Sequence, residues 1–103
     1  MNKKCEIKYS PLFYNDLEKI TDYIKNKLNN VIAANNLLNE IEKEIEKRRY
    51  NPSSYEKFLT NKKRKYIYYR IYVKRYIIFY IVEDNVMEVK RIIYRKRNME
   101  RLI

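Results

Sequence analysis

Strand-forming residues fill the C-terminal part of the chain, from Tyr66 to Arg97. Tyr, Ile, Val and Phe dominate this stretch and no proline interrupts it, a composition typical of strands. Two breaks divide it: the alternation of faces resets at 73–75, and Asp84-Asn85 suits the left-handed backbone of a tight hairpin turn. The stretch therefore predicts three antiparallel strands, which the rest of the chain supports.

The side-chain pattern assigns faces to these strands. In the first strand, alternation predicts a core face of Ile67, Tyr69, Ile71 and Val73. The second strand is apolar on both faces, which predicts a central strand covered on both sides. The third, about Val86 to Tyr94, places Met87, Val89, Arg91 and Ile93 together. An arginine among apolar neighbours needs a hydrogen-bond acceptor, and Asp16 or Glu18 of the preceding helical region can supply one. We therefore expect a structural ion pair of Arg91 with Asp16.

The N-terminal part predicts a strand followed by two helices. Residues 4–9 alternate weakly, Ser10-Pro11 is typical of a helix start, and Asn29-Asn30 ends that helix in a chain without glycine. The second helix buries Ala34, Leu37 or Leu38, Ile41 and Ile45. We expect a loop from 50 to 63 with a helical turn at 55–59, and a short terminal helix at 98–102. The fold class is therefore α+β: an N-terminal strand and an antiparallel helical hairpin packed on a small, mainly antiparallel sheet, in the order β-α-α-β-β-β.

The amino-acid composition excludes several kinds of active site and metal site. At 103 residues we expect one domain spanning 1–103. The chain has no histidine, no glycine and a single cysteine. Ser-His-Asp triads, histidine-ligated zinc sites, glycine-rich phosphate loops and internal disulfides are therefore excluded, and no metal or small-molecule cofactor is expected. Because no long apolar segment or signal peptide is evident, we expect a cytoplasmic protein without a membrane partner.

The charge is strongly positive and uneven. Residues 64–103 carry 11 basic and 4 acidic side chains, against 13 and 9 in residues 1–63, within a net charge of +11. An excess of this kind favours an acidic or polyanionic partner. The alternative is that the basic residues only keep the chain soluble.

The order and spacing of several segments resemble the RelE/ParE superfamily of bacterial toxins from type II toxin–antitoxin pairs. They are YSPLFYNDLEKITDYI with its acidic Asp16, NNVIAANNLLNEIEKEIE, the Asn-Pro turn, Arg70-Ile71, the strand through Phe79-Tyr80, and a last strand followed by a basic cluster. The resemblance implies a growth-inhibiting toxin that a small antitoxin protein neutralises. RelE-like members cut messenger RNA on the ribosome and typically have an arginine where this chain has Ile77. ParE-like members poison DNA gyrase, commonly have an aliphatic residue there, and carry a His-Gly-Arg-Arg-Asp-like segment where this chain has Tyr94-Arg95-Lys96-Arg97-Asn98.

The basic residues of the sheet and tail are the candidate site. For binding a nucleic acid or a protein target we single out Arg70, Arg75, Arg95, Lys96 and Arg97, with Tyr68, Tyr72 and Tyr94 as surfaces on which bases can stack. If the protein is an enzyme, RNA cleavage needs a base, an acid and cations. The catalytic candidates are then Arg70, Arg75, Tyr94, Lys96 and Arg97.

Three functions remain open from the sequence. The favoured one is a toxin that binds a protein target, DNA gyrase, without chemistry of its own. The alternatives are a ribosome-dependent mRNA endoribonuclease of RelE type and a basic nucleic-acid-binding module without a toxin role.

Overall fold

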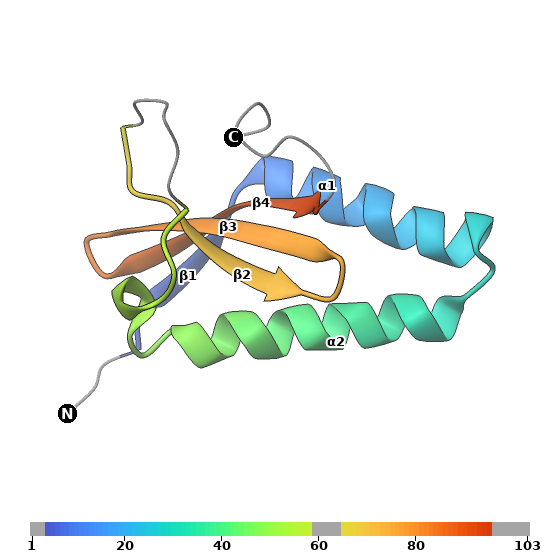
Figure 1. The fold of residues 1–103 in the computed structure, drawn as a ribbon, viewed down its shortest axis with the longest axis horizontal. Helices are drawn as coiled ribbons and strands as arrows, with labels where there is room; N and C mark the ends of the chain where they lie inside the picture. Colours follow the sequence, from blue (N-terminus) through green and yellow to red (C-terminus); the bar gives the residue numbers. More distant parts are fainter. Residues whose placement is uncertain (1–3, 59–64, 96–103) are drawn as a thin grey trace.

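A computed structural model describes residues 4–58 and 65–95 of the chain. In these ranges the elements are β1 (Glu6–Tyr9), α1 (Pro11–Asp22), the π-helical segment η1 (Tyr23–Lys27), α2 (Val31–Arg48), the 3-10 turn η2 (Pro52–Ser54), β2 (Tyr69–Val73), β3 (Tyr76–Glu83) and β4 (Val86–Tyr94). The predicted order and α+β class are confirmed. The two helices form an antiparallel hairpin whose connecting end projects beyond the sheet (Figure 1).

The four strands form one mixed sheet in the order β1-β4-β3-β2. β1 runs parallel to β4, and the other neighbours are antiparallel. The predicted position of β3 inside the sheet is confirmed, and the turn between β3 and β4 uses Asp84 and Asn85 with φ of 50° and 61°. Because L-residues rarely adopt positive φ, the Asp-Asn pair takes the role that glycine has in other hairpins.

Local sequence signals explain where the helices begin and end. The Ser10 hydroxyl accepts a hydrogen bond from the backbone N–H of Phe13, and Pro11 occupies the first position of α1. Asn29 has φ of 51° between the helices, and the Asn30 side chain accepts from the N–H of Ala33 at the start of α2. The buried stripe of α2 is Ala34, Leu37, Ile41 and Ile45, which settles the choice between Leu37 and Leu38.

The sheet has a helix side and an outer side. On the helix side, buried residues of α1, η1 and α2 pack against strand residues that include Ile71, Ile78, Tyr80 and Met87. A smaller cluster of Ile77, Phe79 and Ile93 lies on the outer side, where Phe58 and Tyr68 pack against it. Both faces of β3 are therefore buried, as the sequence predicts.

The single face predicted for the last strand is wrong. A register shift opposite Phe79 and Tyr80 gives β4 an extra residue at Lys90. Met87 and Val89 consequently belong to the helix-side cluster, whereas Ile93 belongs to the outer one. A β-bulge moves the side chains that follow it to the other face, which periodicity alone cannot anticipate.

Two further expectations are corrected. Ile67 is 58% exposed and lies outside the strand, since β2 begins at Tyr69. The helical turn after α2 occupies 52–54 instead of 55–59, because Pro52 favours the first position of a helical turn and Lys57 instead forms a β-bridge with Tyr69. The expected terminal helix at 98–102 lies outside the described residues. Across the described ranges, no helix combines the length and apolarity needed to span a membrane.

Candidate functional site

Three arginines extend from the outer side of the sheet. Arg70 of β2 and Arg91 of β4 are both register partners of Phe79, so the three side chains share one face. Arg95 follows β4 and its guanidinium lies 4.9 Å from the ring centre of Tyr72, another outer-side residue. We call these four residues, Arg70, Tyr72, Arg91 and Arg95, the outer arginine face.

Arg70 is fixed by an acid and by rings. Its Nη2 donates to Glu56 Oε1 at 2.6 Å, and this bond raises the pKa of the guanidinium. Its Cζ also lies 5.4 Å from the ring centre of Tyr72 and 5.9 Å from that of Phe58. The backbone supports this placement, since the Arg70 N–H donates to the Glu56 carbonyl at 3.0 Å. The segment around Glu56 therefore closes the N-terminal part of the β2 edge.

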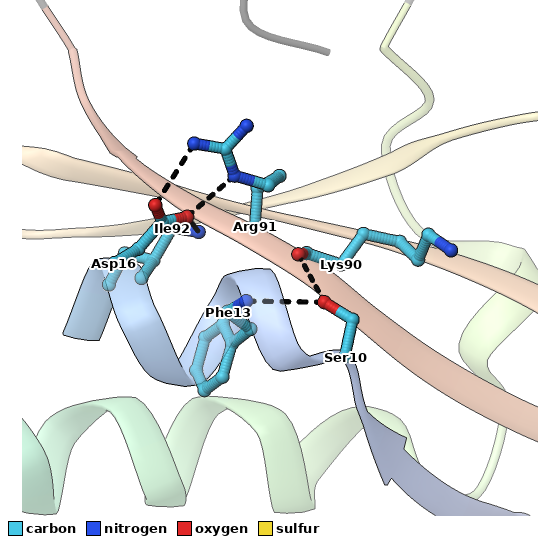
Figure 2. Close-up of polar contacts among 6 residues, drawn as sticks. All are labelled: Ser10, Phe13, Asp16, Lys90, Arg91 and Ile92. Carbon is cyan, nitrogen blue, oxygen red and sulfur yellow. Dashed lines mark hydrogen bonds and ion pairs between the residues drawn. The ribbon is translucent and has the colours of Figure 1, made fainter. Parts of the chain in front are cut away.

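Arg91 forms the ion pair expected with Asp16. Its Nε and Nη2 donate to the two carboxylate oxygens at 2.6 and 2.9 Å, and this bonding raises the pKa of Arg91 (Figure 2). Asp16 also accepts from the backbone N–H of Ile92 at 3.2 Å. The Asp16 carboxylate thus binds both the Arg91 side chain and a backbone N–H at the edge of β4.

Ser10 binds the same edge of β4 from the start of α1. Its hydroxyl donates to the carbonyl of Lys90 at 2.6 Å while it accepts from Phe13 (Figure 2). β1 ends at Tyr9, so beyond it the first turns of α1 satisfy the edge that a longer strand would cover. Ser10 and Asp16 therefore fix where Arg91 emerges.

Arg75 lies at the same end of the sheet as Arg95. Its carbonyl accepts from the N–H of Arg95 at 2.9 Å, and both side chains are exposed. Neither side chain forms an ion pair within the described residues. Lys74, which precedes Arg75, lines a hollow with Glu40 and Glu44 of α2, so the positive charge that no acid faces at this end of β2, within the described residues, is that of Arg75 and Arg95.

The side chain of Tyr94 lies on the opposite face of the sheet from those of Arg70 and Arg95. It is the register partner of Tyr76, and their rings meet at 5.8 Å on the helix side of the sheet. The structure thus brings Arg70 and Arg95 together but does not add Tyr94 to them. Lys96 and Arg97 lie outside the described residues.

Tyr72 and Glu56 carry contacts that sequence reasoning missed. Tyr72 was expected to stack on bases, but its ring already contacts two guanidiniums. Glu56 lies in 55–59, where the sequence predicts a helical turn within a loop, and no periodic signal links it to Arg70.

Other groups on the chain have structural roles. Glu44, which is one turn from Glu40, bonds Arg48 at 2.8 Å, and both side chains of this ion pair are largely buried, so Glu44 serves as a partner of Arg48 and not as half of a carboxylate pair. The buried Tyr80 hydroxyl donates to the carbonyl of Pro52 at 2.7 Å, and burial raises its pKa. In ranges 4–58 and 65–95, no three His, Cys, Asp or Glu side chains converge on a possible metal position.

Comparison with protein families gives one match that covers nearly the whole chain. The family described as the ParE toxin of the type II toxin–antitoxin system, parDE, matches residues 7–99. A search of curated proteins gives no match.

Proposed function

Because this chain belongs to the ParE toxin family and is therefore the toxin of a type II toxin–antitoxin pair, we propose that it stops growth by binding DNA gyrase. An antitoxin protein is its other partner, as the family implies. The outer arginine face, with Arg75 at its end, is the surface that we assign to the target.

The observation that carries this proposal is that the grouped side chains bind charge but do not transfer protons. Arginine stays protonated in proteins and cannot act as a general base. The acids that reach Arg70 and Arg91, Glu56 and Asp16, are each engaged in a short ion pair. Without a histidine in the chain, this arrangement favours binding over RNA cleavage.

The position of Ile77 supports the same conclusion. RelE-like toxins typically carry an arginine at this point, whereas Ile77 is 6% exposed and packs with Phe79 and Ile93. It forms part of the apolar floor beneath the arginines and presents no polar group to a phosphate. Beside Arg91, a hollow of about 340 Å³ is open to solvent and partly lined by Leu12, Tyr68 and Lys90, which suits a macromolecular surface more than an enclosed substrate.

The experiment is inducible expression without antitoxin, following plasmid supercoiling and pulse-labelled protein synthesis over the first minutes. We expect supercoiling to fail first while messenger RNA stays intact. The purified chain should likewise inhibit gyrase in a supercoiling assay. An early stop of translation with cleaved messenger and normal supercoiling would instead establish the endoribonuclease.

A pair of matched variants tests the assigned surface. Arg75→Ala/Arg95→Ala should weaken gyrase inhibition roughly tenfold, since exposed arginines are frequent energetic centres of interfaces. Lys27→Ala/Lys43→Ala removes the same charge from exposed positions on the helical hairpin and should leave inhibition unchanged. Equal losses in both variants would indicate that only net charge matters.

A further inference from the structure

Tyr72 is the residue of the outer arginine face that contacts both Arg70 and Arg95. It is 41% exposed on β2, opposite Ile77, and contributes little to the core. The Cζ atoms of Arg95 and Arg70 lie 4.9 and 5.4 Å from its ring centre. The guanidinium of Arg70, from β2, and that of Arg95, which follows β4, thus both contact the same aromatic ring.

Arg95 depends on this ring for its placement. It reaches Tyr72 from the end of β4, across the start of β3, and forms no ion pair among the described residues. Arg70, by contrast, is also held by Glu56 and Phe58. Because like charges repel, the approach of Arg95 to Arg70 requires an attractive surface between them, and the negative face of an aromatic ring supplies it.

The same corner indicates which chemical group the arginines receive. Arg70, Arg75 and Arg95 carry three positive charges there, and among the described residues Glu56 is the acid that binds one of them. That contact is already a guanidinium–carboxylate bond of 2.6 Å. Glu40 and Glu44 of α2 line a hollow with Tyr72 and Lys74, and in the part of the chain that the structure describes no ion pair joins them to the three arginines. The ring of Tyr72 contacts two cations, so stacking on a nucleobase would have to displace them.

We propose that Tyr72 is a positioning residue that holds Arg95 and Arg70 ready for carboxylates of an acidic segment on the protein target. This inference rests on the proposed function and deepens it, because it names the chemistry of the partner surface. Tyr72 acts through the two arginines, and its ring rather than its hydroxyl is the active part.

The test compares Tyr72→Phe with Tyr72→Leu, which leave the net charge unchanged. Affinity for a synthetic 20-residue polyglutamate peptide is measured by fluorescence anisotropy at low salt, with thermal unfolding as a check of folding. Tyr72→Leu should bind about two- to fivefold more weakly, the range of an exposed cation–π contact, and Tyr72→Phe should match the parent chain. Tyr23→Leu, at an exposed tyrosine of the helical hairpin, serves as the control and should also match it.

A double-mutant comparison keeps the test decisive if leucine destabilises β2. Arg95→Ala should weaken binding of the peptide, and adding Tyr72→Leu should then cause a smaller loss than it causes in the parent chain, because only Arg70 still depends on the ring and Arg70 is also held by Glu56 and Phe58. Unchanged affinity in Tyr72→Leu, or an equal loss in Tyr72→Phe, would overturn the role of the ring. If a single-stranded RNA of equal charge responded to Tyr72→Leu and the peptide did not, the inference of a carboxylate partner would be wrong.

This measurement is independent of gyrase. If gyrase inhibition is absent while the peptide distinguishes leucine from phenylalanine, the proposed target fails and the role of Tyr72 stands. If gyrase is inhibited and the peptide binds the leucine and phenylalanine variants equally well, the proposed target stands and the role of Tyr72 fails.

Discussion

Asp16 is a partly buried acid that joins helix α1 to strand β4. It accepts from two nitrogens of Arg91 and from the N–H of Ile92, with its side chain only 14% exposed. A partly buried ion pair is strongly destabilising when broken, because the remaining charge loses its partner and cannot be fully hydrated. The pair thus fixes α1 to β4 and sets the position of Arg91 on the outer arginine face.

Asp16→Ala should therefore lower the free energy of unfolding by about 2–3 kcal/mol, as expected for hydrogen bonds to charged groups. Asp16→Asn keeps an acceptor and should cost less. Urea denaturation measures both. Glu18→Gln, on the exposed side of the same helix, is the control and should change little; a comparable loss there would show that helix charge, not the pair, determines stability.

Glu44 gives the fold a dependence on acid pH. The hydrogen bond from Arg48 is the main cause of its lowered pKa, relative to an ordinary value of 4.5. A carboxylate with a lowered pKa in the folded state adds stability above its unfolded pKa, and this contribution is lost as the pH falls through the folded value. Glu44→Gln should thus be less stable than the parent chain by about 1.5 kcal/mol at pH 7.

The difference should shrink as the pH falls below 4.5, because the Glu44 carboxylate is protonated first in the unfolded chain and then, as the pH passes through its lowered pKa, in the folded protein as well. Thermal unfolding of the two proteins from neutral to acid pH measures it. Glu40→Gln, one turn earlier and without an ion pair in the described residues, should show no such convergence. A gap between Glu44→Gln and the parent that stays constant as the pH falls below 4.5 would contradict the assignment.

At the scale of elements, this chain forms its turns without glycine. Asn29, Lys74, Asp84 and Asn85 all have positive φ, a conformation that costs most residues about 1–2 kcal/mol and asparagine or aspartate less. Asn29 and the Asp-Asn turn were predictable from sequence because these residue types tolerate that backbone. Lys74 was not, since lysine has no such preference and the closure of β2 on β3 imposes it.

Asn85→Ala should destabilise the protein by about 1 kcal/mol, whereas Asn85→Gly should preserve or increase stability. Asn36→Ala is the matched control: it makes the same change at an exposed position of α2, where alanine is the better residue, and should stabilise by roughly half a kcal/mol. Opposite signs for the two alanine variants in urea denaturation would confirm that backbone conformation is the cause. Equal signs would contradict it.

Periodicity located the elements that local sequence determines, and it missed the features that long-range contacts determine. α2 and β3 were predictable because their buried stripes are long and regular. The bulge at Lys90 was not, because it arises where α1 replaces β1 at the edge of β4 through Ser10 and Asp16. Arg91 was recognised as anomalous by its neighbours, but the face on which it lies follows from that long-range contact.

At the scale of the whole molecule, charge acts on folding and binding in opposite directions. The net charge is +11, and mutual repulsion of this excess opposes the compact state. Several of the ion pairs within the described residues are solvent-exposed, as with Lys4–Glu46, and such pairs contribute little. Salt should therefore relieve more repulsion than the attraction it screens.

We accordingly expect the unfolding temperature to rise by a few degrees between about 0.1 M and about 1 M NaCl, over which the Debye length falls from ~10 Å to ~3 Å. Affinity for the polyglutamate peptide should fall steeply over the same range, because those contacts join opposite charges. Lys27→Ala/Lys43→Ala carries two fewer positive charges, so its unfolding temperature should respond less to salt. A fall in unfolding temperature would mean that the internal ion pairs outweigh repulsion, and an affinity indifferent to salt would show that the outer arginine face is not the surface that the peptide contacts.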